Sequence, residues 1–343
     1  MIDESYIEEA VKKFEEKLKT RPKIAIVGFT GAGKSMLFNA IFGENIASVN
    51  ARAGWTKEGL SEQKWGVTFT DTPGFGSDGL TDRSILIDHI LDAHLVLQVL
   101  NASVGATDYD KALYETIRGK RPVVVALNKI DILDEAELEE VLEGVHEKLP
   151  HLGENLVCIS AKKKIHIDRL IERLTASLPE DIADLLIGEI DPSFKEVKKK
   201  RARAVVQRNA SAAAAVAAIP IPVADIFPIL AIQTEMIIEI AHLFGIELSV
   251  KRAREILLTL TGGIAFRTFF RVLVKFLPGY GSMIGPAIAY AGTQTIGRTA
   301  IYYFENDMKV KPEELKEYYE RQKETAAKEV EHFDFSGAPR ETS

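Results

Sequence analysis

The stretch GFTGAGKS at residues 28–35 decides the fold of the first half of this chain. It fits the pattern G-x-x-x-x-G-K-[ST], it follows the β-branched run Ile24–Val27, and the helical pattern Met36–Phe42 follows it. Glycines at these positions let main-chain N–H groups surround phosphate oxygens, and the helix N-terminus adds a positive dipole. The sequence therefore predicts a phosphate-binding loop between a strand and a helix.

The side chains of this loop have separate expected roles. Lys34 is expected to reach the β- and γ-phosphates of a nucleoside triphosphate, and Ser35 is expected to ligate Mg²⁺. The residues that we expect to contact the nucleotide here are Gly28, Thr30, Gly31, Ala32, Gly33, Lys34, Ser35 and Met36.

A second motif, DTPG at residues 71–74, follows the β-branched run Val67–Thr70. An acid at this place can hold a Mg²⁺-bound water, and the amide of the motif's glycine can sense the γ-phosphate. We therefore expect Asp71 to be a metal-ligating residue, and we expect Gly74 to be catalytic together with Lys34.

A third motif, NKID at residues 128–131, follows the buried-strand pattern Val123–Leu127. Ligands bind in open α/β sheets at the carboxyl ends of the strands. Asp131 can accept hydrogen bonds from the N1–H and 2-amino groups of guanine, whereas adenine lacks the 2-amino donor. The sequence SAK at residues 160–162 would complete the base pocket through main-chain amides. The expected base contacts are Asn128, Lys129, Asp131, Ser160, Ala161 and Lys162.

Short β-branched runs alternate with amphipathic stretches from Lys23 to about Pro179. This alternation predicts an α/β domain with a mainly parallel sheet and helices on both faces. The motifs, in this order and spacing, resemble the GTPase domains of the Era and septin-like group of translation-factor-related GTPases over residues 22–178. The resemblance implies a P-loop GTPase fold that binds GTP or GDP with Mg²⁺. The β-branched runs are residues 24–27, 67–70, 95–100, 123–127 and 156–159.

The resemblance also implies that a threonine closes over Mg²⁺ and the γ-phosphate in the GTP state. Thr56 is the single threonine between Ser35 and Trp65, so we expect it to be both metal-ligating and catalytic. Residues 46–62 and 74–90 would then be the two switch segments, which the γ-phosphate orders and hydrolysis releases.

Phe75 stands where small signalling GTPases place a water-orienting glutamine, so we expect slow intrinsic GTP hydrolysis. Gly31 stands where potassium-stimulated members carry asparagine, so we do not expect stimulation of that type. Dimerisation across the nucleotide face, or a partner, would then accelerate the reaction.

The remaining segments complete the predicted domain organisation. Residues 1–21 form an N-terminal amphipathic helix, and residues 22–178 form the GTPase domain. The acidic residues 179–194 form a linker, and residues 195–335 form a helical domain. The apolar residues at helical spacing in the first segment are Ile7, Val11, Phe14 and Leu18.

The second half lacks β-rich runs and has long stretches of Ala, Ile, Leu and Gly broken by proline, which predicts an all-α domain. From Lys195 to Phe304 it resembles the helical domain shared with the YcjF family and attached to some bacterial Era-like GTPases. A weak internal repeat relates residues 219–238 to residues 277–296. It reflects either two related hairpins or a chance alignment of apolar residues.

The sequence leaves open whether the helical domain contacts a membrane. Residues 276–297 are uncharged but contain two prolines and five glycines, so we favour a water-soluble domain over a spanning helix. Two basic features are each a candidate site for anionic lipid headgroups, and the alternative is a solvated helix face for the first and a core helix with one solvent-facing side for the second. One is the run KKKR at residues 198–201 with Arg203 and Arg208, for which RNA is a further alternative. The other is the stripe of Arg267, Arg271 and Lys275.

Composition limits the function classes. The 343 residues, 46% hydrophobic and 27% charged, predict two folded domains. The formal net charge of −7 argues against broad nucleic-acid binding, and the seven histidines show no ligand spacing. The single cysteine, Cys158, forms no internal disulfide, and the charged N-terminal segment does not resemble a signal peptide. We therefore expect a cytoplasmic protein, with a peripheral position at the inner face of the membrane as the alternative.

These features predict a GTP-binding switch whose nucleotide state is coupled to the helical domain, at a membrane or in a homodimer. Two alternatives stay open at this stage. A ribosome- or RNA-associated Era-like GTPase would need an RNA module, and the C-terminal motifs do not supply one convincingly. A nucleotide-gated scaffold with negligible turnover is permitted by Phe75.

Overall fold

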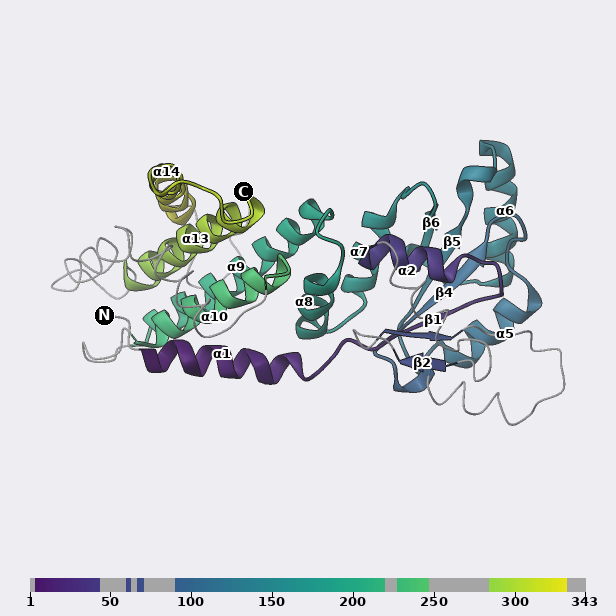
Figure 1. Cartoon of the computed structure of the whole chain (residues 1–343), viewed down its shortest axis with the longest axis horizontal. Helices are drawn as coiled ribbons and strands as arrows, with labels where there is room; N and C mark the ends of the chain where they lie inside the picture. The colour runs from purple at the N-terminus through teal and green to yellow at the C-terminus, as the bar shows by residue number, and fades with distance from the viewer. Residues whose placement is uncertain are drawn as a thin grey trace, which may run out of the picture. The chain divides into compact units, whose positions relative to one another are not determined.

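The computed structural model describes residues 4–43, 60–62, 67–70, 90–219, 227–246 and 284–331. The chain forms two compact units (Figure 1). Residues 20–197 make up the first, called here the α/β unit, and residues 1–19 with 198–343 make up the second, called the helical unit. In sequence, the α/β unit is therefore inserted between the N-terminal helix and the rest of the helical unit.

A six-stranded sheet forms the centre of the α/β unit, with the strand order β2-β3-β1-β4-β5-β6. β1 pairs in parallel with β3 and β4, and β5 pairs in parallel with β4 and β6. The sequence analysis predicted five of these strands, and the mainly parallel sheet is confirmed. The strands are β1 (Ile24–Val27), β2 (Leu60–Glu62), β3 (Val67–Thr70), β4 (Leu95–Asn101), β5 (Val123–Asn128) and β6 (Leu156–Ile159).

β2 is the strand that the sequence analysis missed. It is three residues long, it pairs antiparallel with β3, and Leu60 lies opposite Thr70. Its sequence, LSE, is too short to show an alternating pattern. Its pairing with β3, the next strand along the chain, is what defines it.

The helices of the α/β unit cover both faces of the sheet, as predicted. Ala25 and Val27 of β1 pack in a core with residues of α5 and α6, among them Leu113 and Val145. Because side chains alternate along a strand, the intervening residues of β1 point to the other face, where α2, α7 and α8 lie. The helices are α2 (Lys34–Phe42), α5 (Asp108–Ile117), α6 (Glu135–Lys148), α7 (Ile167–Ala176) and α8 (Glu180–Glu189), with short 3-10 turns η1 (Ile130–Ile132) and η2 (Gly153–Asn155).

α8 occupies most of the segment 179–194, whose acidic composition favours a linker. It is an ordered helix with six buried residues, including Ile182, Leu185 and Leu186. The two units meet in sequence between Val197 and Lys198, three residues into α9. Of its acidic residues, Glu180 and Asp181 are exposed at the start of the helix, whereas Asp184 is buried within the α/β unit.

The described elements of the helical unit are all helices, in agreement with the predicted all-α domain. α1 packs on α10, because Val11 and Phe14 are buried and the Phe14 ring meets the His242 ring edge-on at 5.2 Å. Lys13 and Glu235 form an ion pair between the same two helices, at 2.6 Å. The helices are α1 (Glu4–Leu18), α9 (Lys195–Ala217), α10 (Phe227–Leu243), α13 (Ile284–Glu305) and α14 (Pro312–Glu331).

Three basic residues of α9 make contacts with other helices of the helical unit. Lys198 is 1% exposed, and its ammonium donates to the main-chain oxygen of Leu243 at 2.8 Å. Lys199 pairs with Glu305 at 2.7 Å. A third pair, between Arg208 and Glu239, spans 2.8 Å. A wholly solvated face, one of the two main alternatives for this run, is therefore wrong for these three side chains.

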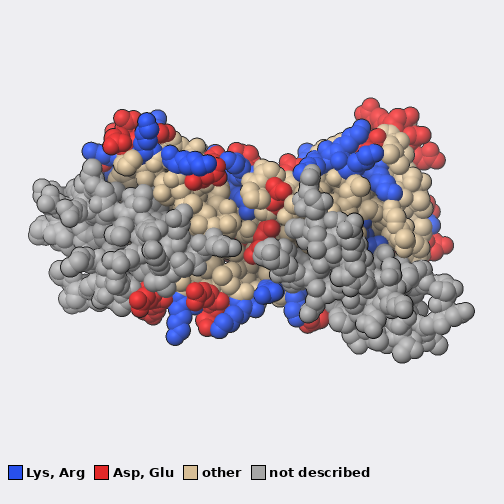
Figure 2. All heavy atoms as spheres, viewed as in Figure 1, with Lys and Arg blue, Asp and Glu red and all other residues tan. Residues whose placement is uncertain are grey.

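Other sequence features lie outside the described residues. They include the basic stripe from Arg267 to Lys275 and the first parts of both copies of the weak internal repeat, at residues 220–226 and 277–283. Within the residues that are described, no helix is both long enough and apolar enough to cross a membrane. Figure 2 shows Lys and Arg side chains next to Asp and Glu side chains on the face in view.

Candidate nucleotide-binding site

The loop between β1 and α2 is shaped by two close main-chain approaches. Gly28 has φ of 145°, and a Cβ at this position would lie 2.2 Å from the carbonyl oxygen of Val99 on β4. Gly33 has φ of 94°, and its Cβ would lie 2.4 Å from the side-chain nitrogen of Asn128. Both conformations favour glycine, and neither position has room for a side chain. These two residues therefore hold the loop against β4 and β5.

Lys34 places a positive charge inside this loop. Its side chain is 6% exposed, and its ammonium donates to the carbonyl oxygens of Gly28 at 2.6 Å and Phe29 at 3.0 Å. The first turn of α2, which the structure describes in full, has no acidic residue, and the N-cap Gly33 supplies no side-chain hydrogen bond. The N-terminal N–H groups and dipole of α2 thus point into the same loop as the ammonium, an arrangement suited to phosphate.

Asn128 joins the loop to the two motifs expected at the base. It is 1% exposed at the end of β5, and its amide nitrogen donates to the carbonyl oxygen of Ala32 at 2.8 Å. Its side-chain oxygen accepts from the main-chain nitrogens of Lys129 and Ala161, each at 2.9 Å. One buried side chain therefore fixes three segments that are far apart in sequence.

Asp131 and Ser160 form a second link between the same segments. The Ser160 hydroxyl donates to Asp131 Oδ1 at 2.6 Å, and it accepts from the main-chain nitrogen of Lys163 at 3.1 Å. The hydrogen bond from Ser160 is the main reason that the pKa of Asp131 is below its usual value. The carboxylate is consequently ionised, and its Oδ1 is held in place by Ser160.

Comparison with known proteins matches two parts of the chain to known families. Residues 23–129 match a family described as 50S ribosome-binding GTPase, and residues 183–328 match a family described as a domain of unknown function, DUF697. The chain carries an Era-like P-loop GTPase domain followed by a helical C-terminal domain. Both parts of the resemblance found in the sequence are thereby confirmed.

Individual relatives match parts of this Era-like chain. GTPase Der of Sulfurihydrogenibium sp. is 30% identical over 192 residues, covering 52% of this chain and 43% of the relative. The tRNA modification GTPase MnmE of Ligilactobacillus salivarius is 32% identical over 237 residues, covering 64% and 47%. A crystal structure of Aquifex aeolicus Era bound to GDP·AlF₄⁻ is 26% identical, covers 46% and 56%, and has a TM-score of 0.35. The chain spans about half the length of these relatives.

The remaining motif residues of the Era-like domain are either exposed to solvent or outside the described part of the chain. Met36 and Lys162 are exposed, as are Thr30 and Gly31 at the outside of the loop. Ser35 is exposed in the first turn of α2, directly after Lys34, so its hydroxyl is accessible to a cation. Among the described residues, no cluster of His, Cys, Asp or Glu side chains forms a metal site by itself. The expected residues Thr56, Asp71, Gly74 and Phe75 lie outside the described part of the chain.

The sequence analysis missed one contact of the phosphate-binding loop. The Phe29 ring meets the Tyr109 ring of α5 edge-on, with their centroids 4.6 Å apart. Thr107 and Asp110 form a capping box that fixes the start of α5 and hence the position of Tyr109. The T-x-x-D spacing of this box is visible in the sequence, whereas the aromatic contact depends on the fold.

Proposed function

We propose that this chain binds GTP and GDP with Mg²⁺, hydrolyses GTP slowly to GDP and phosphate, and couples the nucleotide state to its helical unit. The observation that supports this most strongly is the hydrogen-bonded connection between the phosphate loop and the guanine motifs. Asn128 bonds both Ala32 and Ala161, and Asp131 is held by Ser160. A site that recognises phosphate at one end and guanine at the other end needs this fixed spacing.

In this proposal, charge complementarity binds the triphosphate and stabilises the transition state. Lys34 and the N-terminus of α2 attract the β- and γ-phosphates, and they stabilise the charge on the transferred phosphoryl group. Bound Mg²⁺ would neutralise charge on the phosphate oxygens, and Ser35, Thr56 and Asp71 would hold it. The accessible hydroxyl of Ser35 beside Lys34 fits this role. The amide of Gly74 would respond to the γ-phosphate.

The base would be read by the carboxylate of Asp131, which accepts from guanine N1–H and the 2-amino group. The other expected base contacts are main-chain amides of residues 160–162. In this structure the Ala161 amide donates to Asn128, so that hydrogen bond would have to lengthen or be shared for Ala161 to contact the base. Slow turnover follows from Phe75, which cannot orient the attacking water as a glutamine does.

The proposal is tested with Lys34→Ala and a matched control, Lys120→Ala, whose lysine is exposed in the turn after α5. Affinity for a fluorescent GTP analogue with Mg²⁺ is measured by titration, and phosphate release is followed in multiple-turnover assays. Loss of a charged hydrogen-bond donor to phosphate predicts a fall in affinity of about two orders of magnitude for Lys34→Ala and none for the control. Equal affinity in the two variants would show that the loop is not the triphosphate site.

The cofactor has its own test. Removing Mg²⁺ with a chelator should lower the affinity for the GTP analogue and stop phosphate release, because Lys34 and the N-terminus of α2 alone cannot neutralise the charge of the phosphates. Unchanged turnover without Mg²⁺ would contradict the proposed metal.

Raising the protein concentration tests self-activation, since a turnover number that increases with concentration indicates a homodimer. A constant, negligible value would instead support the nucleotide-gated scaffold.

A ribosome-associated role is the second candidate, and the description of the family matched by residues 23–129 favours it. Co-sedimentation with ribosomes in the presence of GDP or a GTP analogue tests it directly. Flotation with anionic liposomes in the same two nucleotide states tests peripheral membrane contact. Nucleotide-dependent binding in one assay and not in the other would assign the partner of the switch.

A further inference from the structure

The end of α2 is hydrogen-bonded to the segment that follows α8. The main-chain N–H of Asp191 donates to the carbonyl oxygen of Ile41, in the last turn of α2, at 2.9 Å. A Cβ at Gly43, the C-cap of α2, would lie 3.4 Å from the Asp191 carboxylate. A helix that starts in the phosphate-binding loop therefore ends on the chain that leads to α9.

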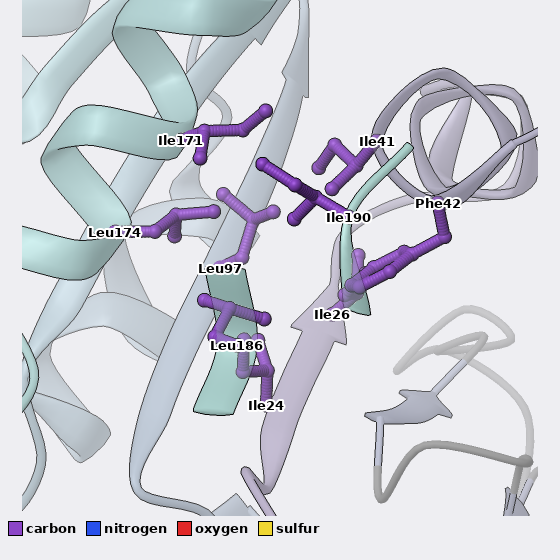
Figure 3. Close-up of a pocket in the computed structure, with 9 residues that line it drawn as sticks. All are labelled: Ile24, Ile26, Ile41, Phe42, Leu97, Ile171, Leu174, Leu186 and Ile190. Atoms are coloured by element: carbon purple, nitrogen blue, oxygen red, sulfur yellow. The ribbon is translucent and has the colours of Figure 1, made fainter. Parts of the chain in front are cut away.

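Apolar side chains make the same connection next to this hydrogen bond. α2, α7 and α8 meet over β1 and β4 around a small cavity of about 10 Å³ (Figure 3). Figure 3 shows Ile41 and Phe42 of α2 on one side and Ile171 and Leu174 of α7 on the other. The cavity is lined by Ile24, Ile26, Ile41, Phe42, Leu97, Ile171, Leu174, Leu186 and Ile190.

α2 is well suited to transmit a displacement from its first turn to its last. It is nine residues long, which corresponds to about 13 Å. Leu37 and Phe38 in its middle are fully buried, so the helix moves as a body or not at all. Its first turn contains Lys34 and Ser35, the two side chains that would follow the γ-phosphate and Mg²⁺.

The cavity leaves space for a small displacement of α2. Its lining is entirely apolar, and its size is at the lower limit for one water molecule, so it is expected to be dry. Side chains beside such a gap lack contact atoms on one side, so a small shift of α2 toward α8 exchanges one set of dispersion contacts for another. Two closely spaced positions of α2 are therefore compatible with this packing.

Hydrogen bonds restrain the segment that follows Asp191. The Asp191 carboxylate accepts from the N–H of Ser193 at 2.8 Å, and the Asp191 carbonyl oxygen accepts from the N–H of Phe194 at 3.1 Å. α9 begins at the next residue, Lys195. A displacement of Asp191 would therefore be passed on to the first turn of α9.

We propose that α8 and the Ile190–Asp191 segment form a coupling element that reports the position of the phosphate-binding helix α2 to the start of α9. This inference rests on the proposed binding of GTP and deepens it, because it names the contact by which nucleotide state reaches the helical half of the chain. In this proposal, the hydrogen bond from the Asp191 N–H to the Ile41 carbonyl transmits a displacement of α2. The apolar side chains around the cavity are the surface along which α2 and α8 shift against each other.

Amide hydrogen exchange of the full chain tests the proposal, with GDP and with a non-hydrolysable GTP analogue. The readout is the Asp191 amide and the amides of the first turn of α9. We expect their exchange rates to differ between the two states on the order of fivefold or more, the lower end of typical coupling energies. Peptides of α6, on the opposite face of the sheet, serve as the internal control and should not change.

Two variants then separate the role of the Asp191 main-chain N–H from the role of the Asp191 carboxylate. Asp191→Pro removes the donated N–H, and the extended ψ of 159° at Ile190 is compatible with a following proline. Asp191→Ala removes the carboxylate and keeps the N–H. Asp191→Pro should keep GTP affinity but abolish the nucleotide-dependent exchange in α9, whereas Asp191→Ala should retain at least part of it. Leu186→Ala, which enlarges the cavity, should reduce the difference without removing the hydrogen bond.

The outcomes are distinct from those that test GTP binding. If wild-type protein binds both nucleotides and the exchange of Asp191 and the α9 amides is the same in both states, the coupling element is wrong while the binding site stands. If neither nucleotide binds, the proposed function fails first. A variant that does not fold changes neither conclusion, because the wild-type exchange measurement decides the proposal by itself.

Discussion

The side-chain nitrogen of Asn128 lies 2.8 Å from the carbonyl oxygen of Ala32, so the end of β5 holds the phosphate-binding loop in place. The contact is tight, because the same nitrogen would be 2.4 Å from a Cβ at Gly33. The loop geometry and the guanine motif are therefore parts of one hydrogen-bonded arrangement. A change at Asn128 is expected to disturb both ends of a bound nucleotide.

Asn128→Ala should weaken GTP and GDP binding by about 10- to 100-fold, because it leaves buried main-chain groups of Ala32 and Ala161 without their partner. Titration with a fluorescent nucleotide measures the change. Asn155→Ala is the matched control, since Asn155 bonds the Arg173 side chain outside the candidate site. Similar losses in both variants would mean that the effect is one of general stability.

Asp131→Asn should shift base preference from guanine toward xanthine, because an amide cannot accept from both N1–H and the 2-amino group. The control is Asp134→Asn, at the N-cap of α6, where asparagine caps as well as aspartate. Competition between GTP and XTP measures the preference. Since the hydrogen bond from Ser160 lowers the pKa of Asp131, GTP preference should not change between about pH 7 and about pH 5. Unaltered base preference in Asp131→Asn would contradict the base assignment.

The strands and the loop motif were predictable from local sequence because each is a continuous pattern with its own turn or helix start. The run 123–128, for example, has six buried residues in a row and ends in Asn128. β2 was not predictable, because it depends on pairing with β3 rather than on its own residues. That Asn128 reaches Ala32, 96 positions earlier, follows only from the strand order of the sheet.

The direction in which a side chain points was the second feature that the sequence alone did not predict. The run 198–201 has four basic residues in succession, yet Lys198 is buried and Lys200 is exposed. The partner of Lys198 is the last carbonyl of α10, 45 positions away, which no local pattern indicates. α8 gives the reverse case. Its acidic residues favoured a linker, whereas its apolar residues already had the spacing of a packed helix.

His94 should make the α/β unit less stable in mild acid. Burial, together with the charges of Lys23 and Arg121, lowers the pKa of His94 below its usual value of 6.5. Its Nδ1 accepts from the main-chain N–H of Lys23 at 2.9 Å, which requires the unprotonated ring. The unfolded chain therefore binds more protons in this range, and stability falls as the pH drops from about 6.5 toward the lowered pKa.

Urea unfolding at a series of pH values measures this effect, followed by the fluorescence of a bound nucleotide analogue. His94→Gln should flatten the pH dependence, because glutamine does not titrate. His146→Gln is the control, since His146 is exposed on α6. An equal slope in wild-type protein and His94→Gln would exclude His94 as the group responsible.

Lys198 should contribute more to stability than its neighbour Lys200. Lys198→Met leaves the Leu243 carbonyl without its donor in a buried site and should lower the free energy of unfolding by about 1–3 kcal/mol. Lys200→Met, at an exposed position of the same helix, should change it by no more than about 0.5 kcal/mol. Amide exchange in α9 and α10 measures both. Equal effects would indicate that burial of Lys198 is unimportant.

Gly297 of α13 faces Val206 of α9 and Met236 of α10. A Cβ there would lie 2.4 Å from one methyl of Val206 and 3.1 Å from the sulfur of Met236. Alanine is favoured over glycine inside a helix by about 1 kcal/mol, but overpacking a core of this kind costs about 1–3 kcal/mol. The steric effect is the larger because Val206 is β-branched and has few alternative rotamers. Gly297→Ala should therefore destabilise the helical unit.

The matched control is Gly144→Ala on α6, where a Cβ would meet no atom within 4 Å. With space available, only the helix preference acts, so this variant should gain about 0.5–1 kcal/mol. Amide exchange in α13 for the first variant and in α6 for the second measures each change in its own unit. Opposite signs are expected from one and the same substitution. If Gly297→Ala also stabilises its helix, then α9 and α10 can separate from α13 more easily than the packing at Val206 implies.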